Sequence, residues 1–241
     1  MVDAALKSAL FDTLATAGRA LANGKRLELL QLLAQGERSV EILAAAAGLN
    51  LTTASAHLQT LKQTGLVTAR RDGVRICYRL AGEDVARLCV MLQQVAQRHL
   101  AEVGVAREAY LGADDTVQLT RDELLERVAE GTAVVLDVRP LEEYLAGHIP
   151  GALSIPLVEL EARLEELADT VEVVAYCRGA NCVLSREAAR LLSARGRRTV
   201  RLADGMLEWR LAGLPVESPG MGGWRPPAPR AGGRDVRDQS F

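Results

Sequence analysis

The stretch from residue 173 to residue 196 constrains the fold of this chain most, because it places a cysteine between two regular elements. Residues 173–176 form a short apolar run typical of a buried strand, and the run ends at Cys177, where a loop containing Gly179 begins. Residues 185–196 then carry apolar side chains at helical spacing and end at Gly196, a common helix terminus. The pattern predicts that Cys177 lies in a turn between a strand and a helix.

The predicted turn gives Cys177 a possible chemical role. Unpaired backbone amides at the start of a helix point toward one spot and carry partial positive charge, which stabilises a thiolate. Arg178 adds a full positive charge at the next residue, so we expect a lowered pKa and a nucleophilic thiolate near neutral pH. The alternative, that Cys177 is only a small core residue at a strand end, fits the local sequence equally well.

The charges of the chain are divided unequally between its two parts. Residues 1–100 hold 12 Lys and Arg against 8 Asp and Glu, a net charge of +4, and the remainder holds 17 against 23, a net charge of −6. A basic part beside an acidic part predicts two domains with different partners, and 241 residues suffice for two ordinary domains. The sequence shows no apolar run of about 18 residues and no signal-peptide pattern, so we expect a cytoplasmic protein with no membrane partner.

The basic part contains a predicted helix-turn-helix. Residues 40–47 and 51–63 are predicted as two short helices joined by a turn at Gly48, with Asn50 as the N-cap of the second. The second helix is predicted to turn Ala54, Leu58 and Leu61 inward. Its outer face carries polar groups that we predict to contact DNA, namely Thr52, Thr53, Ser55, His57 and Gln59.

A predicted β-hairpin follows this helix directly. Two alternating runs, residues 66–71 and 74–80, are joined by Asp72 and Gly73, a strong short hairpin signal. A hairpin in this position is a wing, and its arginines are predicted to neutralise DNA phosphates: Arg70, Arg71, Arg75 and Arg79. The alternative is a solvated hairpin whose charges have no partner.

Residues from about 6 to 100 resemble the winged-helix repressors of the ArsR type. The resemblance is carried by residues 27–33, by the recognition unit over 49–66 with Ala56-His57-Leu58, and by Gly65-Leu66-Val67 before the wing. It implies a mostly α-helical domain that binds an operator in double-stranded DNA and forms a homodimer through its first and last helices. We predict the last helix as one element from residue 83 to about residue 109, with an apolar stripe that needs a partner.

Many members of that family sense metals, and here the sequence departs from them. The family's cysteine cluster has no counterpart between residues 37 and 43. Of its other pattern, on the last helix, only His99 and Glu102 match, because the upstream positions are Ala86 and Leu88. Two candidate ligands do not complete a tetrahedral zinc site, so we predict no metal and no cofactor.

The acidic part alternates strands with helices, which is typical of a parallel α/β sheet. Its predicted strands cover residues 133–139, 153–155, 171–176 and 198–202. Sites of such sheets lie beyond the C-terminal ends of the strands, and Cys177 follows such an end.

This part, over about residues 115–217, resembles the rhodanese domain. Residues 137–144 and 147–152 match its first signature, Cys177-Arg178-Gly179 matches its active loop, and residues 204–209 resemble a late segment, with Asp204 in place of a glycine. The resemblance implies that Cys177 takes sulfane sulfur as a persulfide, cradled by loop amides. The signature side chains either belong to the site or pair with one another to hold the loop: Asp137, Arg139, Glu143 and His148.

Three further cysteines are present. Cys182 closes the loop, and its thiol either attacks a persulfide on Cys177, which releases sulfide and leaves a disulfide, or packs beneath the loop. The loop from Cys177 to Cys182 spans six residues, which among relatives indicates sulfur chemistry, whereas phosphatase and arsenate-reductase loops have seven. Cys77 and Cys89 lie on separate predicted elements, which disfavours a sensing dithiol.

We therefore predict an α/β chain in three parts. Residues 1–110 form a winged helix-turn-helix for DNA binding and dimerisation, 111–217 a rhodanese-like domain with a parallel sheet, and 218–241 a flexible tail. The predicted function is a DNA-binding transcriptional regulator that senses or processes reactive sulfur from thiosulfate or a low-molecular-weight persulfide through Cys177, Arg178 and Cys182. The alternative is a sulfurtransferase enzyme whose winged helix serves dimerisation or recruitment.

Overall fold

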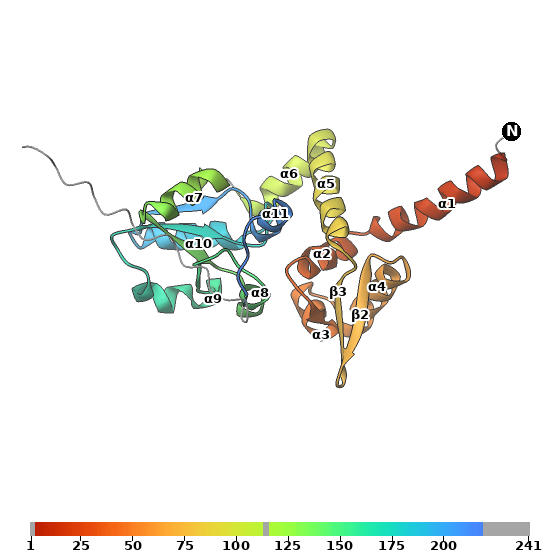
Figure 1. Ribbon diagram of the computed structural model, residues 1–241, viewed down its shortest axis with the longest axis horizontal. Coiled ribbons are helices and arrows are strands. Elements are labelled where there is room, and N and C mark those ends of the chain that lie inside the picture. The colour runs from red at the N-terminus through yellow and green to blue at the C-terminus, as the bar shows by residue number, and fades with distance from the viewer. Residues whose placement is uncertain (1–2, 113–115, 219–241) are drawn as a thin grey trace, which may run out of the picture.

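The N-terminal half of the molecule is a winged helix preceded by a long helix (Figure 1). The structure is a computed structural model that describes residues 3–112 and 116–218; the predicted tail beyond residue 218 lies outside the described residues. The N-terminal elements are α1 (Ala4–Leu21), α2 (Gly24–Leu33), β1 (Arg38–Ser39), α3 (Val40–Ala46), α4 (Leu51–Gln63), β2 (Val67–Asp72), β3 (Arg75–Leu80), α5 (Glu83–His99) and α6 (Ala101–Leu111).

Side-chain caps mark where the helices of the helix-turn-helix begin. Oδ1 of Asn50 accepts a hydrogen bond from the backbone amide of Thr53 at 2.8 Å, so the predicted N-cap of α4 is confirmed. Oγ of Ser39 likewise accepts from the amide of Ile42 at 3.5 Å at the start of α3. The helices pack around one apolar cluster that includes Leu29, Leu30, Leu43, Ala54, Leu58 and Leu61, which confirms the predicted inward face of α4.

The predicted wing is confirmed as an antiparallel hairpin. β2 pairs with β3, and Asp72 lies opposite Arg75 at the tip. Gly73 has a φ of +60°, a left-handed conformation that favours glycine and makes the tight turn possible. β1 pairs with the other edge of β3, and Figure 1 shows the hairpin projecting beyond the helices.

The prediction of one helix from residue 83 to about residue 109 is wrong, because the chain breaks between α5 and α6. Leu100 has an extended backbone, with φ −117° and ψ 103°. Neither glycine nor proline marks this position, so the helical spacing on both sides hid the break. His99 and Glu102 consequently lie on different helices, and Figure 1 shows α6 turning from the end of α5 toward the C-terminal half.

The C-terminal half contains a five-stranded parallel sheet in the order β4-β8-β7-β5-β6, which confirms the predicted α/β class. Thr120 and Glu123 form a capping box at the start of its first helix. Its elements are β4 (Gln118–Leu119), α7 (Arg121–Ala129), β5 (Ala133–Asp137), α8 (Leu141–Leu145), β6 (Leu153–Ser154), α9 (Leu157–Leu160), the 3-10 helix η1 (Glu161–Glu166), β7 (Glu172–Tyr176), α10 (Leu184–Ala194), β8 (Thr199–Leu202) and α11 (Met206–Leu211).

The central strand β7 supplies both faces of the sheet with apolar side chains. Val174 and Tyr176 belong to the cluster beneath α7 and α11, whereas Val173 and Ala175 belong to the cluster beneath α9 and α10. This alternation is the two-residue period of a strand covered on both faces. The apolar run before Cys177 is therefore a buried strand, as predicted.

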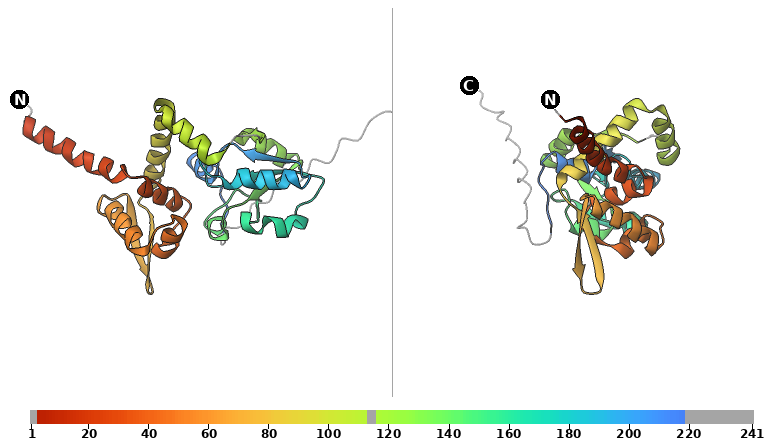
Figure 2. Two further views of the ribbon diagram at one scale, coloured as in Figure 1. Left: turned by 180° about the vertical axis from the view of Figure 1, so that it is seen from behind. Right: turned by 90° about the vertical axis from the view of Figure 1, so that its right-hand side faces the viewer.

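Two helices of the N-terminal half leave apolar side chains exposed. Figure 2 shows α1 projecting away from the rest of the molecule. The exposed residues are Leu6, Leu10, Phe11 and Leu14 on α1 and Leu88, Met91, Leu92 and Val95 on α5. No helix in the described part of the chain is long and apolar enough to cross a membrane.

Candidate functional site

The predicted arrangement of strand, loop and helix around Cys177 is present. β7 ends at Tyr176 and α10 begins at Leu184, so the connecting loop leaves the middle strand of the sheet at its C-terminal end. Sites of parallel sheets lie at such ends. Residues 177–182 are called the active loop below.

The surroundings of Cys177 favour its thiolate. The side chain is only 2% exposed, and its Sγ lies 3.1 Å from Oγ of Ser185. Burial raises the pKa of Cys177, but hydrogen bonds from the side chains of Cys182 and Ser185, with backbone groups of Ser185 and Gly179, outweigh it and lower the pKa below the ordinary value. The sequence predicted a lowered pKa for Cys177, and this geometry gives the same direction. Backbone groups of the loop and of the following helix are among the causes that lower this pKa.

Cys182 differs from Cys177 in its protonation. The hydrogen bond between Cys182 and Cys177 is the largest cause that raises the pKa of Cys182, and burial is the second. Cys182 therefore remains a protonated thiol. The pKa values of the two thiols of the active loop are therefore shifted in opposite directions, with Cys177 lowered and Cys182 raised. Both are free cysteines, and Cys182 is 7% exposed.

Arg178 is directed away from the sulfur atoms and toward a buried carboxylate. Its Nε and Nη2 donate to Glu143 at 2.9 and 2.6 Å, and Glu143 is fully buried. Nη2 of Arg38, from β1 of the winged helix, lies 3.0 Å from the same carboxylate. The main task of Arg178 in this geometry is therefore to anchor the loop, and the strongest support for the thiolate comes from Cys182 and Ser185.

The residues of the first rhodanese signature hold the base of the active loop rather than the sulfur. Arg139 and Asp137 are fully buried and paired through contacts of 2.5 to 3.2 Å, and the hydroxyl of Tyr176 donates to Asp137 at 2.5 Å. His148 stacks on the ring of Tyr144, with ring centroids 3.6 Å apart. These contacts support the structural interpretation of the signature residues.

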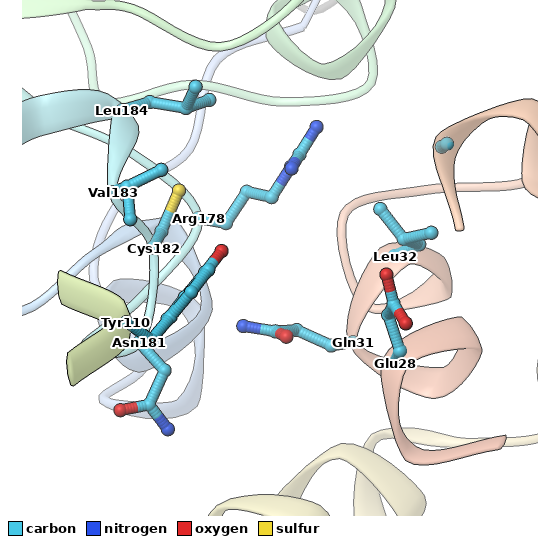
Figure 3. A pocket seen from close by; sticks show the side chains of 10 residues that line it. Glu28, Gln31, Leu32, Tyr110, Arg178, Asn181, Cys182, Val183 and Leu184 are labelled. Carbon is cyan, nitrogen blue, oxygen red and sulfur yellow. The ribbon is translucent and has the colours of Figure 1, made fainter. Parts of the chain in front are cut away.

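A pocket of about 420 Å³ opens beside the active loop at the junction with the winged helix. Figure 3 shows Cys182, Arg178 and Asn181 on one side of this pocket and Gln31 and Glu28 of α2 on the other. Cys182 therefore lines the pocket, whereas Cys177 is not among its lining residues and is buried.

The outer face of α4 presents the polar residues predicted to contact DNA. Thr52 is exposed, and Thr53, Ser55 and His57 are half-buried. Gln59 is exposed, but its side chain is held in place because its amide donates a hydrogen bond to the hydroxyl of Tyr78 in the wing at 3.1 Å. This hydrogen bond also connects α4 to the wing.

The wing arginines are exposed but differ in their partners. Arg70 is paired with Glu37 at 2.6 Å, and this contact holds the wing to the segment after α2. Arg79 donates to Thr68 at 3.2 Å across the hairpin, and Arg71 donates to the carbonyl oxygen of Gly73 at 3.0 Å. Arg75, which is exposed at the tip of the hairpin, is thus well placed to meet a phosphate.

Sequence reasoning missed several residues that hold the active loop: Ser185 and Gln35 contact it directly, and Arg38 shares the carboxylate of Glu143 with Arg178. Ser185, the hydrogen-bond partner of Cys177, was interpreted only as part of the following helix, although a hydroxyl in the first turn after the loop was a usable signal. Gln35 and Arg38 lie more than a hundred residues away in the chain, and no local pattern marks them.

The remaining cysteines lie on two different elements of the winged helix. Cys77 is half-buried on β3, and Cys89 is buried in the core of the winged helix, where burial raises the pKa of its thiol. Both are free cysteines on separate elements, as predicted.

Fold and site together define a winged-helix protein joined to a rhodanese-like domain, and comparisons with known proteins agree. The family model of the bacterial regulatory proteins of the arsR family matches residues 23–69, and the rhodanese-like domain model matches residues 120–212. The HTH-type transcriptional regulator Rv0324 of Mycobacterium tuberculosis is 58% identical over 211 residues, which are 88% of this chain and 93% of that protein. The chain therefore belongs to the ArsR family of transcriptional regulators, in a form that carries a C-terminal rhodanese domain.

Two further relatives match one half of the chain each. A winged helix-turn-helix DNA-binding domain from Mycobacterium bovis, whose solution structure is described as homodimeric, is 60% identical and covers 42% of this chain and 93% of its own, with a TM-score of 0.39. A sulfurtransferase of Allochromatium vinosum is 32% identical over 104 residues, 42% of this chain and 95% of that protein.

Proposed function

We propose that this regulator binds its operator as a homodimer and that sulfane sulfur on Cys177 changes its affinity for DNA. The observation that carries the proposal is the active loop itself. It holds a buried cysteine of lowered pKa beside a protonated Cys182, and it contacts the winged helix directly.

Exposed apolar faces support the homodimer. α1 and α5 carry large apolar side chains that are exposed to solvent in a single chain. Such faces are typical of helices that pack against a partner. A second copy of the chain would bury both faces at once about a two-fold axis. Dimerisation would also place two copies of α4 and the wing to contact adjacent major grooves.

The first chemical step is sulfur transfer to Cys177. With thiosulfate, the thiolate of Cys177 attacks the outer sulfur, the S–S bond of thiosulfate breaks, and sulfite leaves with the electron pair. With a low-molecular-weight persulfide, the same attack on the outer sulfur releases the donor as a thiolate. Both routes leave a persulfide on Cys177 without a net change in oxidation state of the system.

The second step uses Cys182. Its thiol attacks Sγ of Cys177, a Cys177–Cys182 disulfide forms, and the outer sulfur leaves with the proton as hydrogen sulfide. The persulfide is reduced to sulfide, and the two cysteines are oxidised to the disulfide, so the electrons balance. A disulfide moves the whole active loop, whereas a persulfide adds one sulfur atom.

Mass spectrometry with operator binding tests this function. The protein is exposed to thiosulfate, glutathione persulfide or inorganic polysulfide, and the masses of the Cys177 peptide are compared with affinity for promoter fragments from the same cell. We expect a gain of one sulfur, or loss of two hydrogens, together with altered DNA affinity. Unchanged masses and unchanged affinity with all three donors would contradict the proposal.

A sulfurtransferase enzyme is the second candidate, and the likeness to the Allochromatium protein over nearly its whole length favours it. In that case the winged helix would only dimerise or recruit the enzyme. Gel shifts at moderate salt separate the two functions, because a regulator forms a specific complex whose affinity falls with salt. Rapid turnover of thiosulfate without any specific complex would favour the enzyme.

A further inference from the structure

The active loop is bound by the N-terminal half as well as by its own domain. Nε of Arg107, on α6, donates to Oδ1 of Asn181 at 3.0 Å, and Asn181 donates to Gln93 of α5 at 3.3 Å. At the other end of the loop, Nε2 of Gln35 donates to the carbonyl oxygen of Arg178 at 3.3 Å. Both ends of the active loop therefore contact the half of the molecule that carries the winged helix.

Gln35 is the most enclosed of these contacts. It is fully buried, and both ends of its carboxamide are used, because Oε1 accepts from Nη1 of Arg139 at 3.0 Å while Nε2 serves the loop. The carbonyl oxygen of Arg178 also accepts from the amide of Leu207 at 3.1 Å, so Gln35 supplies its second donor. A buried amide whose partners both belong to the other domain is satisfied only when the domains are docked.

The backbone around Gln35 approaches the rhodanese domain closely. A Cβ on Gly36 would lie 2.8 Å from Cβ of Ala146, so only glycine fits at this approach. The carbonyl oxygen of Ala34 accepts from Nη1 of Arg210 at 3.0 Å. Three successive residues after α2 are therefore in contact with the second domain.

The same segment leads directly into the helix-turn-helix. Arg38, which shares the buried carboxylate of Glu143 with the active loop, lies in β1 immediately before Ser39. Ser39 is the N-cap of α3, and α3 packs against the predicted recognition helix α4. A displacement of the active loop thus acts on the residues from which α3 starts.

We propose that Gln35, although it belongs to the winged helix, is a positioning residue of the rhodanese loop and the contact through which a change at Cys177 reaches the helix-turn-helix. The second half of this inference rests on the proposed function, and the first half does not. Loop amides can support the sulfur of Cys177 only while the main chain at Arg178 is held in place, and Gln35 holds it from outside the domain.

The contact supplies the free-energy difference that coupling between sites requires. When a Cys177–Cys182 disulfide pulls the loop, Gln35 loses its acceptor at Arg178, and a buried donor without a partner destabilises that conformation. The winged helix then relaxes to restore a partner. Linkage is reciprocal, so DNA that holds the winged helix in one conformation also shifts the equilibrium between the dithiol and the disulfide of Cys177 and Cys182.

The test compares three variants of the full chain. Gln35→Met removes both hydrogen bonds at nearly the same volume. Gln35→Glu, ionised beside Arg139, keeps the acceptor for that arginine but offers no donor to the carbonyl oxygen of Arg178, so we expect the domains to stay docked while the loop contact is lost. Gln63→Met is the matched control, because Gln63 is exposed at the last position of α4 and does not line the pocket beside the active loop.

Two readouts are measured, with thermal melting as a check of folding. The rate of modification of Cys177 by iodoacetamide is followed against pH, and we expect both Gln35 variants, but not Gln63→Met, to shift the profile to higher pH. The change in operator affinity caused by inorganic polysulfide should fall about fivefold or more in the Gln35 variants. If Gln35→Met unfolds, Gln35→Glu decides.

Profiles and DNA responses of both Gln35 variants that coincide with those of the wild type would overturn the inference. A different result would identify failure of the proposed function. If the wild type gains no sulfur from any donor, the sulfur function fails, while the iodoacetamide profiles still decide whether Gln35 positions the loop.

Discussion

The winged helix and the rhodanese domain expose their functional groups in opposite ways. The outer face of α4 is polar, and side chains such as Thr52 and, at the tip of the wing, Arg75 reach solvent. In the rhodanese domain Cys177 is 2% exposed, and Arg139 and Glu143 are fully buried. Substitution at the first surface should therefore change function with little change in stability, whereas substitution around the active loop should change both.

The largest expected effect is the loss of sulfur chemistry in Cys177→Ser. A hydroxyl is not ionised near neutral pH, so the variant should gain no sulfur and show no sulfur effect on DNA affinity. Cys182→Ser should still load sulfur on Cys177 but lose the DNA response, because no disulfide can form. Peptide mass spectrometry and operator titration with and without a persulfide donor measure both.

The pair of cysteine variants also locates the sensor. A DNA response that persists in Cys177→Ser would show that the active loop is not the sensing site, and the experiment would then turn to Cys77 and Cys89. Cys89→Ala is the matched control, because it removes another buried thiol from a different domain.

The next effect is on stability. Arg139→Met should lower the free energy of unfolding by about 3–5 kcal/mol, because it leaves the buried carboxylate of Asp137 without its charge partner. Arg163→Met is the control: Arg163 pairs with Glu159 and Glu166 on the surface, and its removal should cost much less, because solvent screens these pairs. Urea unfolding of both variants measures the two losses in the free energy of unfolding. Equal losses would contradict the expected difference between a buried and a solvent-exposed ion pair.

These buried networks also show where prediction from sequence ends. The strand, loop and helix around Cys177 were predictable because the alternation of apolar residues and the glycine loop are local, and the cap at Asn50 is equally local. The break at Leu100 was not, because the residues around it carry no helix-ending signal. Gln35 acquires its role only from partners distant in sequence, which no local pattern contains.

On the open surface, effects on DNA binding should be moderate and separable. Arg75→Ala should weaken binding about equally on all sequences and reduce the slope of log affinity against log salt by about 1, as for loss of one phosphate contact. His57→Ala should instead change preference at one base pair by about 1–3 kcal/mol. Titrations against matched and altered operators distinguish them. If both variants behave alike, α4 is wrongly placed as the recognition helix.

The smallest expected effect concerns one hydrogen bond within the active loop. Ser185→Ala removes the hydroxyl 3.1 Å from Sγ of Cys177, one of the groups that lower its pKa, so the pKa of Cys177 should rise. Iodoacetamide should then react more slowly than with the wild type near neutral pH. At alkaline pH the two rates should converge, because the thiolate is fully formed in both proteins.

The control for this effect is Ser193→Ala, on the exposed face of the same helix. It should leave the pH profile unchanged, since its hydroxyl is remote from the active loop. A constant ratio of rates for Ser185→Ala at every pH would instead mean that the hydroxyl controls access to Cys177 and not its ionisation. Ser185 would then shield the thiol of Cys177 from solvent and reagents. The low exposure of this thiol would in that case depend on side-chain packing more than on hydrogen bonding.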